Sequence, residues 1–241
     1  MAGLVTGSSI VNPDTKLTDA GVDVVIDRVT RVDPRARTVR VAQGSEYPYD
    51  KLIVSTGSRP LVPPIPGRDL EGVFALRSLA HAEAIREFLD RGSPRRLTFV
   101  GAGFISLEIA TLLKEARSDL EITIVEALPH PLPTMLDEEL CTRVERHLEE
   151  KGIALQLSKK VVAIQGDGTV RAVELDSGTV IESDMVFVNV GVRPNVELAE
   201  DMGLELGEFG IQINEFLETS DPHVLAAGDC ANNRHFVTGR P

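Results

Sequence analysis

The stretch from residue 96 to residue 126 constrains the fold more than any other part of the chain. Leu97 to Val100 is a short apolar run typical of a buried strand, and Gly101-Ala102-Gly103 follows it at once. Ile105 to Lys114 then repeats apolar side chains at helical spacing. Ile122 to Val125 is a second apolar run, and it ends on Glu126. The order of strand, glycine turn, helix, strand and acid predicts a βαβ unit of the kind that binds dinucleotides.

The glycines and the acid have separate roles in such a unit. Gly101 permits the tight turn after the strand. Gly103 has no Cβ, so the backbone can approach a pyrophosphate at the helix N-terminus. Glu126 stands near the expected offset of about 20 residues and can accept hydrogen bonds from the ribose hydroxyls of adenosine. A carboxylate there repels a 2′-phosphate, and no Arg follows it, so the sequence favours NADH over NADPH.

Ser106 departs from the motif because it stands where a third glycine is expected. That glycine lets the helix pack closely on the strand. Since serine is small, we expect slightly looser packing and no loss of binding. A purely structural glycine turn is the alternative, but both strands, the helix and the terminal acid together favour cofactor binding.

Composition excludes several classes of function. A chain of 241 residues can form one large or two small domains, and its net charge of −12 argues against a nucleic-acid or anionic-membrane binder. The longest apolar runs have strand length, so we expect no membrane span, and residues 1–10 lack the features of a secretory signal. Cys141 and Cys230 form no CxxC pair and the five histidines are scattered. We therefore expect reduced thiols, no metal site and a cytoplasmic protein.

Further elements are expected on both sides of the βαβ unit. The pattern predicts helices over 76–91 and 140–148, and strands over 22–26, 38–41, 51–55, 186–190, 211–214 and 224–227. The β-rich segments 153–165, 170–175 and 180–190 predict a meander appended to the parallel unit. Four prolines between Pro60 and Gly67 predict an extended connection between domains.

Four motifs in chain order resemble those of the FAD-dependent pyridine nucleotide-disulfide oxidoreductases. They are Ser55–Pro60, Gly101–Glu108, Val190–Asn195 and Thr219–Asp229. The tail from Asp229 to Pro241 is similar to the branch that holds CoA-disulfide reductases, NADH oxidases and NADH peroxidases. The resemblance implies that hydride passes from NADH to FAD and then to a disulfide, a peroxide or oxygen.

The resemblance also implies site residues. Glu108 matches an acid near the contact of nicotinamide and flavin, and it is the candidate catalytic residue. An exposed helix acid is the alternative, but the apolar neighbours of Glu108 suggest a partly buried site. For Gly191, a plain turn glycine is an equal alternative. The expected cofactor-binding residues are Gly101, Gly103, Phe104, Ile105, Ser106, Glu126 and Gly191 for NAD, with Thr56, Gly57, Gly228 and Asp229 for FAD.

The expected architecture is an α/β fold in which a Rossmann-like NAD-binding domain is inserted between two partial segments of an FAD-binding domain. The predicted borders are 1–72, 73–199 and 200–241, with the NAD-binding domain in the middle. No strand–GxGxxG–helix for the ADP half of FAD precedes Val22, and the branch's redox cysteine and dimerisation domain are not found. We therefore expect an internal fragment of a homodimeric enzyme. The alternative is a non-catalytic NAD-binding module.

Overall fold

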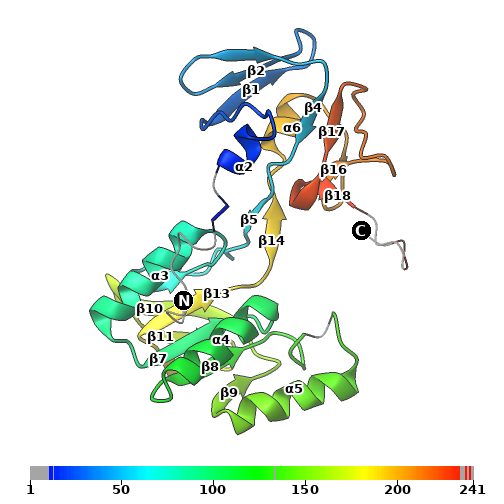
Figure 1. Cartoon of the computed structure of the whole chain (residues 1–241). Coiled ribbons are helices and arrows are strands. Elements are labelled where there is room, and N and C mark those ends of the chain that lie inside the picture. Colours follow the sequence, from blue (N-terminus) through cyan, green and yellow to red (C-terminus); the bar gives the residue numbers. More distant parts are fainter. Residues whose placement is uncertain (1–10, 13, 133, 234–236, 238, 240–241) are drawn as a thin grey trace. The chain divides into compact units, whose positions relative to one another are not determined.

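The chain folds into two compact units. The computed structural model describes residues 11–12, 14–132, 134–233, 237 and 239. One unit holds residues 60–191, and the other is formed by residues 12–59 together with residues 192–241 (Figure 1). We call them the central unit and the flanking unit. The functional domain borders expected from the sequence stay a prediction, and the residues of the tail motif beyond 233 lie largely outside the described residues.

A five-stranded parallel sheet forms the middle of the central unit. Its strand order is β6-β13-β7-β8-β9, and every neighbouring pair is parallel. The strands are β6 (Val73–Phe74), β7 (Arg96–Val100), β8 (Glu121–Val125), β9 (Ile153–Gln156) and β13 (Met185–Val188). Helices α3 (Leu79–Gly92), α4 (Phe104–Ala116) and α5 (Glu138–Glu150) connect β6 to β7, β7 to β8 and β8 to β9. These crossovers make the strands parallel, as the βαβ prediction requires.

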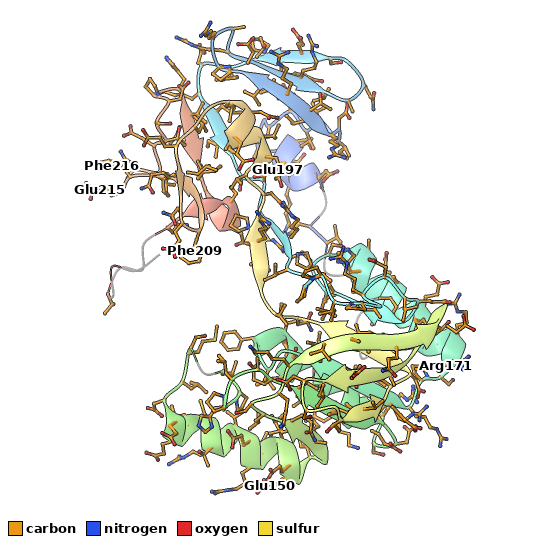
Figure 2. The ribbon with its side chains drawn as sticks, turned by 180° about the vertical axis from the view of Figure 1, so that it is seen from behind. Glu150, Arg171, Glu197, Phe209, Glu215 and Phe216 are labelled. Atoms are coloured by element: carbon orange, nitrogen blue, oxygen red, sulfur yellow. The ribbon has the colours of Figure 1, made fainter. Side chains whose placement is uncertain are left out.

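Both faces of this sheet are covered. Leu97 and Phe99 of β7 join a core with the three helices, whereas Val100 joins a second core with the antiparallel strands behind. Those strands are β10 (Val161–Asp167), β11 (Thr169–Leu175) and β12 (Val180–Glu182). In Figure 2, Arg171 on β11 and Glu150 at the end of α5 mark the two outer layers. Burial on both faces explains why the parallel strands read as continuous apolar runs.

The predicted meander is correct only for its middle. Strands β10, β11 and β12 pair antiparallel, but β9 and β13 belong to the parallel sheet, beside β8 and β7. All four residues of β13 are buried. A short apolar run of this kind fits a parallel strand that is buried on both faces of its sheet. Periodicity along the chain cannot distinguish such a strand from one in the core of a β-sandwich.

The flanking unit is built from several small sheets. Its strands are β1 (Val29–Asp33), β2 (Thr38–Val41), β3 (Glu46–Pro48), β4 (Leu52–Val54), β5 (Ser58–Pro60), β14 (Val192–Pro194), β15 (Leu206–Gly207), β16 (Gly210–Gln212), β17 (Val224–Ala226) and β18 (Ala231–Asn232). The sheets are β1-β2-β3, β17-β4, β15-β16-β18 and β14-β5. Short helices are α2 (Thr15–Thr18), α6 (Glu197–Asp201) and the 3₁₀ turn η1 (Gly228–Cys230). Val54, Ile211 and Ala226 lie in its core.

The predicted strand over residues 22–26 is wrong. These residues have no regular secondary structure, and Ile26 is 83% exposed. The β-branched composition suggested a strand, but a strand also needs a neighbour with which to pair its backbone. No strand of the described part of the chain pairs with this segment. Separately, no helix in the described part of the chain is long and apolar enough to cross a membrane.

Candidate dinucleotide site

The glycine turn between β7 and α4 assigns different roles to its two glycines. Gly101 has φ of 95°, and a Cβ there would lie 2.5 Å from the carbonyl oxygen of Asn189. Gly103 has φ of −81°, and a Cβ there would meet nothing within 4 Å. The fold itself therefore requires glycine at position 101, whereas Gly103 leaves open space in front of the helix.

Helix α4 begins without a side-chain cap. The other two helices on this face have one, because Ser78 accepts from the His81 N–H at α3 and Asp137 accepts from the Leu140 N–H at α5. Gly103 is the N-cap of α4 and makes no such bond. The N–H groups and partial positive charge of a helix start then attract an anion.

The carboxylate of Glu126 lies beside the same turn. Its Oε2 accepts from the Ala102 N–H at 2.7 Å, and its Oε1 accepts from the Leu128 N–H at 2.9 Å. The side chain is half-buried at the end of β8. Each oxygen keeps further capacity to accept, so the acid is held in place and can still receive ribose hydroxyls. The structure thus brings the predicted acid and the predicted glycines together.

A cavity of about 590 Å³ opens at this edge of the sheet. It lies at the carboxyl ends of β7, β8 and β13, where ligands bind in open α/β sheets. All of its lining residues belong to the central unit. Of the predicted residues it includes Gly101, Gly103, Glu126 and Gly191. The remaining lining is Pro63, Val100, Val125, Ala127, Leu128, Leu132, Thr134, Met135, Lys159, Lys160, Val161, Asn189 and Val190.

A larger cavity of about 860 Å³ lies at the opposite edge, near the starts of β7 and β8. Several of its charged groups pair with one another, as Arg96 does with Asp184 and Arg91 with Glu71. It contains no glycine turn and no start of a long helix. The glycine turn, the helix start and the acid converge in the smaller cavity, which is therefore the candidate dinucleotide site.

Ser106 is buried and hydrogen-bonded. It has no exposed surface, and its Oγ accepts from Asn189 Nδ2 at 3.3 Å. Asn189 follows β13, so the serine that replaces the third glycine links α4 to the neighbouring strand. The hydrogen bond meets the requirement that a buried hydroxyl be satisfied.

The residues predicted next to the nicotinamide lie on the solvent-exposed side of α4. Phe104 is 61% exposed, Ile105 is 40% exposed and Glu108 is exposed. The expectation that Glu108 is partly buried is therefore wrong. Its neighbours Leu107 and Ile109 are buried, but adjacent helix positions point in different directions, so they do not bury it. Its catalytic role stays a prediction.

The two predicted flavin motifs contact each other, and the first of them also contacts Asn195 of the Val190–Asn195 motif, within the flanking unit. Thr56 Oγ1 donates to the Asn195 carbonyl at 2.7 Å, and the Asn195 N–H donates to the Gly57 carbonyl at 2.9 Å. Ser58 Oγ donates to Asp229 Oδ2 at 2.8 Å. Gly228 has φ of 79° at the turn before Asp229, which is exposed. Three motifs far apart in sequence are thus joined by hydrogen bonds, while their contact with FAD stays a prediction.

Both cysteines are free and buried. Cys230 Sγ lies 3.3 Å from the Ala227 carbonyl, as expected for a small buried side chain. Burial raises the pKa of the Cys141 thiol, and the nearby Glu145 and Asp137 carboxylates raise it further. A reactive thiolate is disfavoured there. Among the described residues, no group of three or more His, Cys, Asp or Glu could hold a metal ion.

Sequence reasoning missed part of the cavity wall. Lys159 and Lys160 follow β9, and Asn189 follows β13. The two lysines belong to no recognised motif, and in the sequence they are indistinguishable from ordinary surface residues. Only the strand order, which places β9 next to β8, brings them beside Glu126. The two lysines could have been placed beside Glu126 from the sequence only if residues 153–156 had been recognised as a parallel strand.

Comparison with known proteins establishes the family. The model of the pyridine nucleotide-disulphide oxidoreductases matches residues 5–240, and the chain therefore belongs to this family. This confirms the resemblance drawn from the four motifs, and solved members of the family confirm the predicted α/β fold class.

Individual relatives are closely similar over nearly all of the chain. An NADH oxidase of Methanocaldococcus jannaschii is 37% identical over 94% of this chain and 51% of its own length. A CoA-dependent NAD(P)H sulfur oxidoreductase of Pyrococcus abyssi is 33% identical over 95% and 51%. The structure of an NAD-dependent persulfide reductase from A. fulgidus has a TM-score of 0.91 at 35% identity, covering 99% and 46%. The chain spans about half the length of these relatives.

Proposed function

We propose that the central unit binds NADH in the cavity at the glycine turn, and that the whole protein is a flavoprotein oxidoreductase that uses this NADH. The observation that carries the proposal is the convergence of open space at Gly103, the uncapped start of α4 and the Glu126 carboxylate in one cavity. A dinucleotide needs these three features for its pyrophosphate and its ribose.

Each part of the site has a distinct task in this proposal. The first N–H groups of α4 hold the pyrophosphate, which can approach because position 103 has no side chain. Glu126 receives the adenosine ribose hydroxyls and repels a 2′-phosphate, which favours NADH over NADPH. Gly191 lines the cavity after β13 and leaves room for the rest of the cofactor, because a Cβ there would meet nothing within 4 Å. Phe104, Ile105 and Ser106 form the first turn that supports it.

The residues of the flanking unit are proposed to hold the second cofactor. Thr56, Gly57, Gly228 and Asp229 lie in motifs that hydrogen-bond to one another or to shared partners, which supports a common site for FAD. When bound, FAD supplies the two-electron acceptor for the hydride of NADH. Glu108 is proposed to orient the nicotinamide side of this transfer through its exposed carboxylate.

The names of two relatives point to different final electron acceptors. The relative from M. jannaschii is named an NADH oxidase and the one from P. abyssi a CoA-dependent sulfur oxidoreductase. We propose a disulfide, a peroxide or oxygen as the acceptor, and a cytoplasmic homodimer as the form of the whole protein.

A second function is supported by the location of the cavity. Because all of the lining residues belong to the central unit, the chain can bind NADH without flavin chemistry. It would then be an NAD-binding module without redox turnover.

Absorbance and binding measurements on the purified chain separate these functions. We would incubate it with FAD, remove free flavin, titrate NADH by calorimetry, and add NADH anaerobically while following flavin absorbance. Retained flavin that is bleached by NADH supports the oxidoreductase. NADH binding by a chain that retains no flavin supports the module. Absence of NADH binding would rule out both.

A further inference from the structure

We propose that Lys159 and Lys160 weaken the preference of the cavity for NADH, so that NADPH binds as well. The inference rests on the proposed NADH site and concerns its choice between the two nucleotides. Both lysines line the same cavity as Glu126, and neither belongs to a motif recognised in the sequence.

Backbone hydrogen bonds place the two lysines beside the acid. The Glu126 N–H donates to the Gln156 carbonyl at 2.9 Å, and the Lys159 N–H donates to the Glu126 carbonyl at 3.0 Å. The Ser158 N–H donates to the Leu128 carbonyl at 3.0 Å. The segment from 156 to 159 is therefore tied to the loop that carries the ribose-binding acid.

A turn at Ser158 redirects the chain at this point. Ser158 has φ of 52°, a left-handed conformation that costs energy for a residue with a Cβ. The hydrogen bond from its N–H to Leu128 holds the turn in place. The turn separates β9 from β10 and puts Lys159 and Lys160 on the cavity wall.

The charges of these lysines are available to a ligand. Among the described residues, no carboxylate oxygen lies within 4 Å of either ammonium group, whereas Lys151 pairs with Glu115 and many arginines have acidic partners. Lys159 is half-buried and Lys160 is exposed. The half-buried position reduces screening by solvent, so its charge acts more strongly on a nearby anion.

The 2′-phosphate of NADPH is the group that these charges would attract. A nucleotide whose ribose lies against Glu126 carries its 2′ position at the part of the cavity where segment 126–128 meets segment 156–160. Glu126 repels a phosphate there, and the two ammonium groups oppose that repulsion. NADH has no 2′-phosphate, so it gains less from them. The balance predicts a modest NADH preference in place of a strong one.

Calorimetric titration of the full chain with NADH and with NADPH, at one fixed ionic strength, tests this inference. Replacing both residues in K159Q/K160Q should raise the Kd for NADPH about three- to tenfold, and the Kd for NADH by less than about twofold. The charge-preserving variant K159R/K160R should keep the ratio of the two Kd values near that of the natural chain.

Arg86→Gln is a control because it removes a positive charge from an exposed side chain of α3 that pairs with Asp90, away from the cavity. It should leave the ratio unchanged. A thermal unfolding scan of each variant confirms that it is folded.

The possible outcomes separate the two proposals. NADH binding by the natural chain tests the cavity, and the ratio of the Kd values tests the lysines. If K159Q/K160Q changes the ratio no more than Arg86→Gln does, the inference is overturned while the NADH site stands. If neither nucleotide binds the natural chain, the NADH site fails and the inference fails with it.

Discussion

The central and flanking units differ in how fully they bury their apolar residues. In the central unit, β13 is buried along its whole length and Phe99 and Phe187 have no exposed surface. In the flanking unit, Ile26 is 83% exposed and Phe216 is 69% exposed. Figure 2 shows Phe216 and Phe209 projecting from the surface of the flanking unit. Large exposed apolar side chains contribute little to the stability of the unit that carries them.

The same contrast applies to the two candidate sites. The candidate dinucleotide cavity is lined entirely by the central unit, with helix, turn and acid all present. The flavin motifs of the flanking unit are joined through side-chain hydrogen bonds such as Ser58 to Asp229. One unit can therefore supply every wall of a site when a single sheet and the elements that cover it provide the turn, the helix start and the acid together.

Truncation of the central core should have the largest effect. Phe187 stacks on Phe99 with ring centroids 4.5 Å apart, and both are fully buried. Phe187→Ala should lower the free energy of unfolding of the central unit by about 3–5 kcal/mol, because it leaves a cavity between two layers. Denaturant titration followed by far-UV circular dichroism measures the loss.

Tyrosine fluorescence supplies the internal control for that experiment. The chain has no Trp, and its two tyrosines, Tyr47 and Tyr49, both belong to the flanking unit. Their transition should move less than the circular dichroism transition. Equal shifts of both would show that the two units unfold as one, against the contrast drawn above.

Substitution of the two turn glycines should separate folding from binding. Gly101→Ala should cost about 2 kcal/mol of stability, because a Cβ would meet the Asn189 carbonyl at 2.5 Å in a left-handed conformation. Gly103→Ala should leave the melting temperature unchanged and weaken NADH binding. A pair of thermal scans and NADH titrations distinguishes them, and a stable Gly101→Ala would contradict the geometry of the turn.

Removal of the Asp184 carboxylate should have a smaller effect that depends on pH. Its hydrogen bond with the Arg96 guanidinium lowers the pKa of Asp184 below its usual value, and backbone N–H groups of Arg96 and Arg95 lower it further. The native carboxylate is therefore stabilising above the unfolded pKa near 3.9, and this contribution is lost as pH falls through the lower native pKa.

Asp184→Asn should accordingly cost about 1–2 kcal/mol at pH 7. The difference from the natural chain should close as the pH falls below about 4. Denaturant midpoints across this pH range measure the effect. A gap that stays constant down to pH 2 would exclude the Arg96 partnership as its cause.

Substitution on the exposed surface of the flanking unit should have the smallest effect. Phe216→Ser removes a side chain that is 69% exposed, so the free energy of unfolding should change by less than about 0.5 kcal/mol. Tyrosine fluorescence follows the relevant unit. A loss comparable to that of Phe187→Ala would mean that Phe216 is buried in solution.

Local patterns explain most of what the sequence could predict. Strand β7, helix α4 and strand β8 are contiguous, and each signal lies within its own residues. The acid Glu126 follows from the same stretch. Exposure of Glu108 could not be read from its apolar neighbours, because a helix turns by about 100° at each residue.

The parts that were missed depend on contacts between distant residues. Insertion of β13 between β6 and β7 joins segments far apart in the chain, and so does the approach of Lys159 to Glu126. The failed strand at residues 22–26 lacked a pairing partner, which composition does not reveal. In each case the missing information was which segments lie beside one another and in what register. The secondary-structure preference of the segment itself does not contain it.

Titration of the chain with NADH by calorimetry, beside the variant Glu126→Gln, shows whether NADH binds at the glycine turn through this acid. Glu126→Gln keeps the size of the side chain but replaces the carboxylate, whose oxygens accept from the Ala102 and Leu128 N–H groups, with a neutral amide. We predict saturable one-to-one binding by the natural chain and a Kd about tenfold higher for the variant, as expected when charge-assisted hydrogen bonds are weakened. Equal affinities, or no heat of binding with either protein, would contradict the assignment of the cavity to NADH.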